Sequence, residues 1–214
     1  MADAKKKTLE EFLMPTGRLI NNSLFEKDAF KSERSNKESV PAYRAEVAYD
    51  DKDLDAFYDK LQSIAEAEWG KGSKLDIDGG TVSTLLDGDK LKAKREKKGK
   101  TGDAYGGKSV MRSKTIYNKD GADGPGGIQV WDEDVKPVDF LKRAAIYNGC
   151  MVQVLVGINP YEDDDGEPCF SYYLKAVQKV GDGERLVSSA DTSTAFKPVG
   201  RAAGEDTGRR SRRG

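Results

Sequence analysis

The chain has 214 residues, of which 36% are hydrophobic and 34% charged, and its formal net charge is −1. It contains no histidine, which excludes Ser-His-Asp and Cys-His catalysis and the commonest metal ligand. No apolar run approaches the roughly 18 residues that a membrane-spanning helix needs, and the lysine-rich start leads into TLEEF instead of an apolar signal segment. We therefore expect one domain with a small core and long loops, without catalysis, cofactor, metal or membrane insertion.

The first part of the chain is expected to contain a leader and two strands. Residues 1–14 are predicted to be flexible, with one helical turn at most in TLEEFL, because Pro15 and Gly17 interrupt the segment. Residues 18–25 are predicted to form the first strand and residues 40–49 the second. The polar segment between them would be a long loop.

The strongest helix signal covers residues 50–69. Its apolar residues recur at intervals of three and four and form one stripe, which consists of Leu54, Phe57, Tyr58, Leu61, Ile64 and Ala65. The acidic start suits the positive end of the helix dipole, and Gly70 is expected to end the helix. The aromatic residues of the stripe are interpreted as packing against the domain core.

A dense positive charge follows a turn-rich stretch at residues 70–89, in which TVSTLL forms a short strand at most. Residues 90–119 contain eleven basic and two acidic residues, a local charge of +9. A polyanion is the natural partner of such a segment. The alternative is a solvated charged loop, and the nearby Tyr105 and Tyr117 favour the polyanion.

Three further elements are predicted before the last hairpin. Residues 109–118 are predicted to form a strand, but neither of its alternating faces is purely apolar, which indicates a bulge or a twist. Residues 118–127 are expected to form a flexible loop. A short strand at 128–131 and a short helix at 138–145 follow.

The strongest strand signal is a hairpin near the end of the chain. Residues 151–158 are almost continuously apolar, residues 170–177 are rich in aromatic and branched side chains, and EDDDGEP between them favours a turn. Alternation places Tyr172 in the core and Tyr173 outside. Val177 falls on the outer face, so a bulge beyond Lys175 is considered.

Several short segments resemble bacteriophage single-stranded-DNA-binding proteins with an oligonucleotide-binding (OB) fold. They are Tyr147-Asn148-Gly149-Cys150, the segment LKAVQK that leads into DGERL, and the segments GRLI and LFE near the start. The resemblance implies a mainly β fold, a five-stranded OB-fold barrel with one inter-strand helix, long loops and disordered termini. The domain would span residues 15–186, and residues 187–214 would be a disordered basic tail.

The resemblance also implies the function. It is sequence-nonspecific binding that coats and protects single-stranded DNA during phage DNA replication, recombination and repair, in the cytoplasm of the host bacterial cell. Phage polymerase, helicase-primase and a second copy of the chain are candidate protein partners. Relatives commonly end in an acidic tail, whereas residues 201–214 here hold five arginines and two acidic residues, so this tail is expected to add phosphate contacts.

OB-fold proteins bind oligonucleotides across their second and third strands and adjoining loops. Tyr43 is assigned equally to the core or to the DNA surface. The expected DNA contacts are Arg18, Tyr43, Arg44, Lys94, Arg95, Lys97, Lys98, Tyr105, Lys108, Arg112, Lys114, Tyr117, Tyr173 and Lys175.

Three other functions are weighed against this one. An RNA-binding OB-fold protein would show the same cations and rings. A noncatalytic virion structural protein would explain the strands and loops but not the charge of +9. A metal-dependent nuclease would need clustered carboxylates on strands, whereas here they lie in turns.

Overall fold

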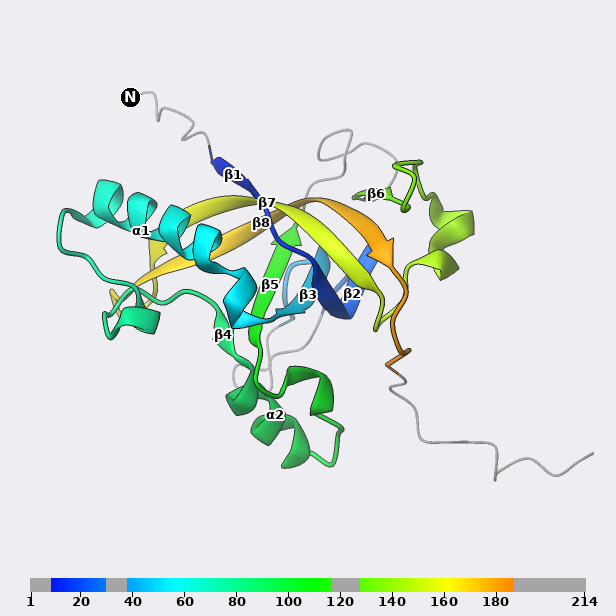
Figure 1. The fold of residues 1–214 in the computed structure, drawn as a ribbon, viewed down its shortest axis with the longest axis horizontal. Helices are drawn as coiled ribbons and strands as arrows, with labels where there is room; N and C mark the ends of the chain where they lie inside the picture. Colours follow the sequence, from blue (N-terminus) through cyan, green and yellow to red (C-terminus); the bar gives the residue numbers. More distant parts are fainter. Residues whose placement is uncertain (1–8, 30–37, 117–127, 187–214) are drawn as a thin grey trace, which may run out of the picture.

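The computed structural model describes residues 9–29, 38–116 and 128–186, and its fold is mainly β (Figure 1). The strands are β1 (Glu10–Leu13), β2 (Gly17–Asp28), β3 (Ala42–Tyr49), β4 (Leu86–Asp87), β5 (Ser109–Thr115), β6 (Gln129–Trp131), β7 (Met151–Glu162) and β8 (Pro168–Gly181). The α-helices are α1 (Asp55–Trp69) and α2 (Gly88–Glu96), and the 3₁₀ helices are η1 (Asp51–Asp53), η2 (Asp76–Asp78), η3 (Asp103–Tyr105) and η4 (Phe140–Ala145). Among the described residues, no helix has the length and apolar character needed to cross a bilayer.

Five strands close into a ring in the order β2, β3, β5, β8, β7 and back to β2. Strand β3 is antiparallel to β2 and β5, strand β5 is parallel to β8, and β7 forms an antiparallel hairpin with β8. Strand β7 also pairs with the start of β2, which completes the ring. The predicted five-stranded, OB-like arrangement is therefore confirmed, and the strands predicted near residues 18–25, 40–49, 109–118 and 128–131 are present.

Strand β1 corrects the expectation of a flexible leader through residue 14. Residues 10–13 pair with Leu155–Ile158 of β7, while the start of β2 pairs with residues 151 and 152 of the same strand. Strands β1 and β2 thus lie along successive parts of β7. The segment EEFL is too short and too charged to carry a strand pattern by itself, and its pairing comes from the long apolar partner. Residues 1–8 and 187–214, predicted to be disordered, lie outside the described residues.

The core fills the interior of the ring, and α1 covers one end of it (Figure 1). The predicted apolar stripe is confirmed, because Phe57, Leu61, Ile64 and Ala65 are buried. The ring of Phe57 lies 5.3 Å from that of Phe12 in β1. The aromatic residues of α1 are therefore packing residues. Gly70, with φ of 98°, follows the helix directly, as predicted.

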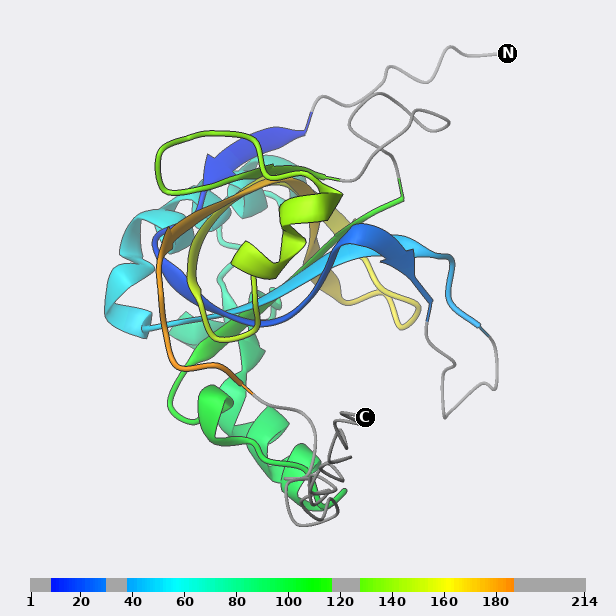
Figure 2. The same cartoon turned by 90° about the vertical axis from the view of Figure 1, so that its right-hand side faces the viewer.

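Helix α2 is a second helix, in a segment that was predicted only as a charged stretch. Asp87 caps it by accepting a hydrogen bond of 3.0 Å from the backbone of Lys90. We call residues 88–108, which comprise α2, η3 and the turns around them, the basic arm. Figures 1 and 2 show the arm standing off one side of the ring.

The basic arm packs on the outside of the ring through a small second core. This core consists of Ile20, Ala48, Tyr105 and Val110, with Leu91 of α2 packed against it. Both faces of β5 are therefore buried near its start. Strand β5 pairs with β3 without a shift from Tyr43 to Tyr49, so the bulge, one of the two features considered for this strand, is absent from this pairing. The arm explains the mixed pattern.

The bulge considered in β8 is confirmed. Leu155 pairs with Ala176 and Val156 pairs with Leu174, which leaves Lys175 as the extra residue. Beyond it the faces exchange, and Val177 is fully buried. Strand β8 thus presents Tyr173 outward and Val177 inward, although strict alternation would give them the same face.

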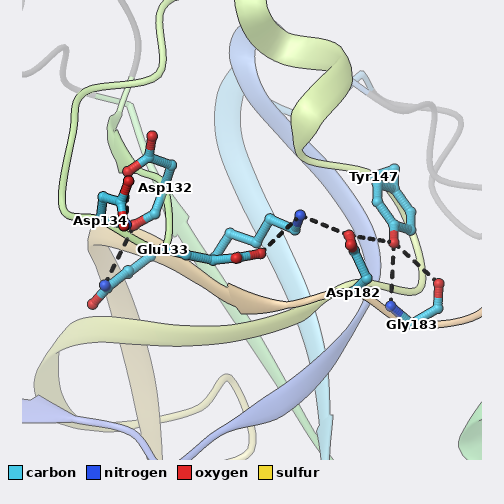
Figure 3. Close-up of polar contacts among 8 residues, drawn as sticks. Asp132, Glu133, Asp134, Tyr147, Asp182 and Gly183 are labelled. Carbon is cyan, nitrogen blue, oxygen red and sulfur yellow. Dashed lines mark hydrogen bonds and ion pairs between the residues drawn. The ribbon is translucent and has the colours of Figure 1, made fainter.

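A polar network holds the end of β8 in place (Figure 3). The ammonium of Lys179 lies 2.6 Å from Asp182 and 3.1 Å from Glu133, and its hydrogen bond to Asp182, with that to Glu133, raises the pKa of Lys179 to about 12. The hydroxyl of Tyr147 donates to Asp182 at 2.9 Å. These contacts anchor residues 182–186, whose last member, Leu186, packs against the second core beside the basic arm.

The glycine in the segment YNGC is needed for this arrangement. Gly149 has a φ of 112°, and a Cβ there would lie 2.0 Å from the carbonyl oxygen of Glu184. The backbone amide of Leu186 donates to the carbonyl of Asn148 at 2.8 Å. A side chain at position 149 would push residues 182–186 away from this turn.

Candidate nucleic-acid interface

Outward side chains of three neighbouring ring strands form one surface, which we call the outer face. It consists of Arg44 and Glu46 on β3, Arg112 and Lys114 on β5, and Tyr173 on β8. The strand register pairs Arg44 with Lys114 and Lys114 with Tyr173. Two cations and an aromatic ring therefore lie in a row across the three strands.

The middle and end of this row are open to solvent. Tyr173 is 39% exposed, and Lys114 is exposed and makes no ion pair within the described ranges. Ile116, which directly follows the end of β5, is 43% exposed and adds an apolar side chain close to Lys114 in the chain. An exposed ring beside cations can stack on a base while the cations contact phosphates.

Glu46 is a negative charge within the outer face. Its carboxylate accepts a hydrogen bond of 2.7 Å from the guanidinium of Arg112 and one of 3.1 Å from the hydroxyl of Tyr105. The side chain of Glu46 is 13% exposed, against 59% for Arg112. Glu46 thus connects the outer face to the basic arm and offsets part of the charge of Arg112.

Two tyrosines expected at the DNA surface are buried. Tyr43 is 6% exposed and belongs to the main core. Of its two predicted locations, the core and the DNA surface, the core is therefore the correct one. Tyr105 is 3% exposed, and burial, reinforced by Glu46, raises the pKa of its hydroxyl to about 12. Arg95 lies over the Tyr105 ring at 5.2 Å. Stacking of a base on Tyr105 is therefore not supported.

Several of the expected cationic contacts are held by other groups. Arg18 donates to the carbonyl of Glu184 at 2.9 Å, Lys108 pairs with Asp50, and Lys175 pairs with Glu11. Arg95 donates to the carbonyl of Thr101 at 2.9 Å. Arg44 bonds to Ser39 at 3.2 Å and to nearby carbonyls. These cations secure loops and strands as well as adding to the surface charge.

The remaining expected DNA contacts lie on the basic arm or outside the residues that the structure describes. Lys94, Lys97 and Lys98 are exposed on the arm. Tyr117 lies outside the described residues. Glu46 and the neighbouring Ile116 were not predicted as part of this region. Ile116 could have been found, because alternation along residues 109–118 places it on the same side as Lys114, whereas Glu46 has no sequence signal.

No family model and no curated protein matches this sequence, but solved structures match the fold. The single-stranded DNA-binding protein from bacteriophage Enc34 aligns with a TM-score of 0.56 and 14% identity, over 87% of this chain and 90% of that chain. Its complex with single-stranded DNA aligns with a TM-score of 0.57 and 14% identity, over 86% and 100% of the two chains. A C-terminally truncated form gives 0.55 and 15%, over 82% and 88%. This chain therefore has the fold of a phage single-stranded-DNA-binding protein.

Proposed function

We propose that the protein binds single-stranded DNA on the outer face, without sequence preference and without catalysis. The observation that carries this proposal is the row of Arg44, Lys114 and Tyr173 across β3, β5 and β8. Strands β3 and β5 are the second and third strands of the ring, the pair on which OB folds bind oligonucleotides. The likeness to a structure that was solved with single-stranded DNA supports the choice of ligand.

The chemistry of the row accounts for binding without base readout. A stacked tyrosine accepts any base, because every base has an aromatic face, and Lys114 and Arg112 can neutralise neighbouring phosphates. Ile116 can contact the edge of a stacked base or a sugar. Most of the affinity would then be electrostatic and would fall as salt rises.

This mode of binding suits a protein that coats transient single strands. We infer that it protects such strands during phage DNA replication, recombination and repair in the cytoplasm of the infected bacterium. Phage replication proteins such as a polymerase or a helicase-primase, and a second copy of this chain, are proposed protein partners.

The test is a comparison of labelled single-stranded DNA, duplex DNA and RNA of matched sequence by fluorescence anisotropy, with a nuclease assay in magnesium. Single-stranded DNA should bind most tightly, and Lys114→Ala and Tyr173→Ala should each weaken that binding. Phe140→Ala is the matched control, because Phe140 is 42% exposed but lies on η4, outside the outer face. Tighter RNA binding, cleavage of DNA, or equal losses in all three variants would contradict the proposal.

A further inference from the structure

We propose that the basic arm is a second phosphate-binding surface, which extends the path of the bound strand beyond the outer face. This inference rests on the proposed function and adds a second segment to its site. The ligand class is the sugar-phosphate backbone of the same single strand. Two groups of cations on the arm differ in whether the protein itself provides their partners, and this difference supports the inference.

The first group of cations holds the arm together. Lys92 lies 3.5 Å from Asp103 and 3.9 Å from Glu96, and Arg95 packs over Tyr105 while donating to Thr101. Lys108 joins the arm to Asp50, and Lys90 lies 3.5 Å from Asp87. The protein itself provides partners for these four cations, which explains their presence in the arm.

The second group has no such role. Lys94, Lys97 and Lys100 are exposed, and within the part of the chain that the structure describes none of them forms an ion pair. A cation at the C-terminal end of a helix is favoured by the helix dipole, which accounts for Lys94 and contributes at Lys97, the C-terminal cap of α2. It does not account for Lys100, which lies beyond the cap. Three uncompensated cations within seven residues are a polyanion-binding feature.

The basic arm is fixed in a position that single-stranded DNA bound on the outer face can reach. Leu91 packs against the second core, which includes Val110 of β5, and Tyr105 donates to Glu46 on the outer face. Lys114 and Val110 are four residues apart in β5, which corresponds to a separation of about 13 Å at the usual rise per residue of a strand. Arg112 lies between them, so cations continue from Lys114 toward the arm. Figure 1 shows α2 next to the start of β5.

The arm offers charge without a stacking surface. Tyr105 is its single aromatic residue, and it is 3% exposed. Contacts here would therefore be made to phosphates and would not depend on the bases. For single strands, log affinity falls with log salt by about 0.7 per phosphate neutralised, so three lysines correspond to a slope of about 2.

The experiment compares a Lys94→Gln/Lys97→Gln/Lys100→Gln variant with the wild-type chain on two lengths of oligo-dT. One oligonucleotide has about 6 nucleotides and the other about 20, which bracket most of the site sizes known for OB folds. The control variant is Lys52→Gln/Lys71→Gln/Lys142→Gln, which removes the same charge from exposed lysines outside both surfaces. Circular dichroism melting confirms that both variants are folded.

We expect the arm variant to match the wild type on the short oligonucleotide. On the long one it should bind at least tenfold more weakly at low salt, with a salt slope reduced by about 2. For the control variant, the salt slope should change only slightly, and by the same amount on the short and the long oligonucleotide. The inference is overturned if the arm variant loses the same factor on both lengths, or if it loses nothing on the long one. It is also overturned if the loss is confined to duplex DNA, because the arm would then hold a separate ligand.

Failure of the proposed function would look different. If Tyr173→Ala leaves the binding of the short oligonucleotide unchanged, the outer face is not the site, whatever the arm does. If Tyr173→Ala weakens short-strand binding while the arm variant behaves as wild type on both lengths, the outer face stands and the extended path does not.

Discussion

Tyr172 and Tyr173 are neighbours in β8 with opposite environments, and replacing each in turn tests the assignment of the outer face. Tyr173 is 39% exposed, whereas Tyr172 is 5% exposed. The hydroxyl of Tyr172 donates to the carbonyl of Thr84 at 3.2 Å, and its ring lies 5.8 Å from that of Phe57. Tyr173→Ala should therefore affect binding, and Tyr172→Ala should affect stability.

The magnitudes separate the two variants clearly. Loss of one base-stacking ring costs about 1 to 3 kcal/mol of binding, which is roughly a 5- to 150-fold rise in Kd. The stability change for Tyr173→Ala should stay within about 0.5 kcal/mol, as for other surface positions. Loss of the buried Tyr172 ring should cost about 3 to 5 kcal/mol of folding free energy, a fall in Tm of roughly 6 to 20 °C for a chain of this size.

Both quantities can be measured on the same preparations. Tm is obtained by circular dichroism, and Kd for a short oligo-dT by anisotropy at a temperature where Tyr172→Ala remains folded. Tyr172→Phe serves as the control, because it keeps the buried ring and removes one hydrogen bond worth about 1 kcal/mol. The reasoning is refuted if Tyr172→Ala loses binding while its Tm is unchanged, because the outward register of β8 would then be shifted by one residue.

Three further predictions concern charge. Glu46→Gln should tighten single-stranded DNA binding, because it removes the negative charge that holds Arg112 at 2.7 Å; a higher Kd would show instead that Glu46 acts by positioning Arg112. Deletion of residues 201–214, which hold five arginines and two acidic residues, should leave Tm unchanged and weaken DNA binding modestly, and tighter binding would contradict this role for the tail. Hydrogen bonds from Lys179 and then Tyr147 lower the pKa of the Asp182 carboxyl below 3.8, so its contribution to stability is complete above that pH and is lost as the pH falls through the lowered value. Urea unfolding at pH 7 and pH 3 should therefore show a smaller acid loss in Asp182→Asn than in the wild type, and equal losses would exclude a role for this pair.

The elements that the sequence predicted well are those with a strong local pattern. The apolar run of β7 and the aromatic start of β8 each cover several strand positions, and the apolar stripe of α1 covers more than one helical turn. Their burial follows from the side-chain period alone. The outward position of Tyr173 and the bulge after it were predictable for the same reason.

The elements that the sequence did not predict depend on contacts with distant residues. Strand β1 is four residues long and exists because β7 extends past the start of β2. Helix α2 has one apolar residue on its packed side, Leu91, so it has no stripe to detect, and its cap at Asp87 is the local signal that remains. The burial of Tyr105 depends on Ile20 and Ala48, which are far from it in the sequence.

The candidate site shows the same division. Alternation alone places Lys114 and Tyr173 on outward positions of their strands. Their alignment with Arg44 depends on the parallel pairing of β5 with β8 and on the register of β5 with β3, which no local pattern specifies. Glu46 was missed because a single glutamate on a strand has no distinguishing feature until its partners, Arg112 and Tyr105, are known.

The extra residues of β8 bear on how this hairpin tolerates changes in length. Strand β8 has 14 residues and β7 has 12, and the two extra residues are Lys175 and Val180, where the register shifts. Deleting Lys175 would restore a regular ladder, with Leu174 inward, Ala176 outward and Val177 still inward, at the cost of the local twist that a bulge provides. Deleting Leu174 instead would make Tyr173 and Lys175 consecutive residues, so that one of their side chains would have to point into the core. Single-residue deletions along this strand should therefore be accepted at the bulges and rejected between them, which gives the hairpin two sites where its length can vary without inverting its faces.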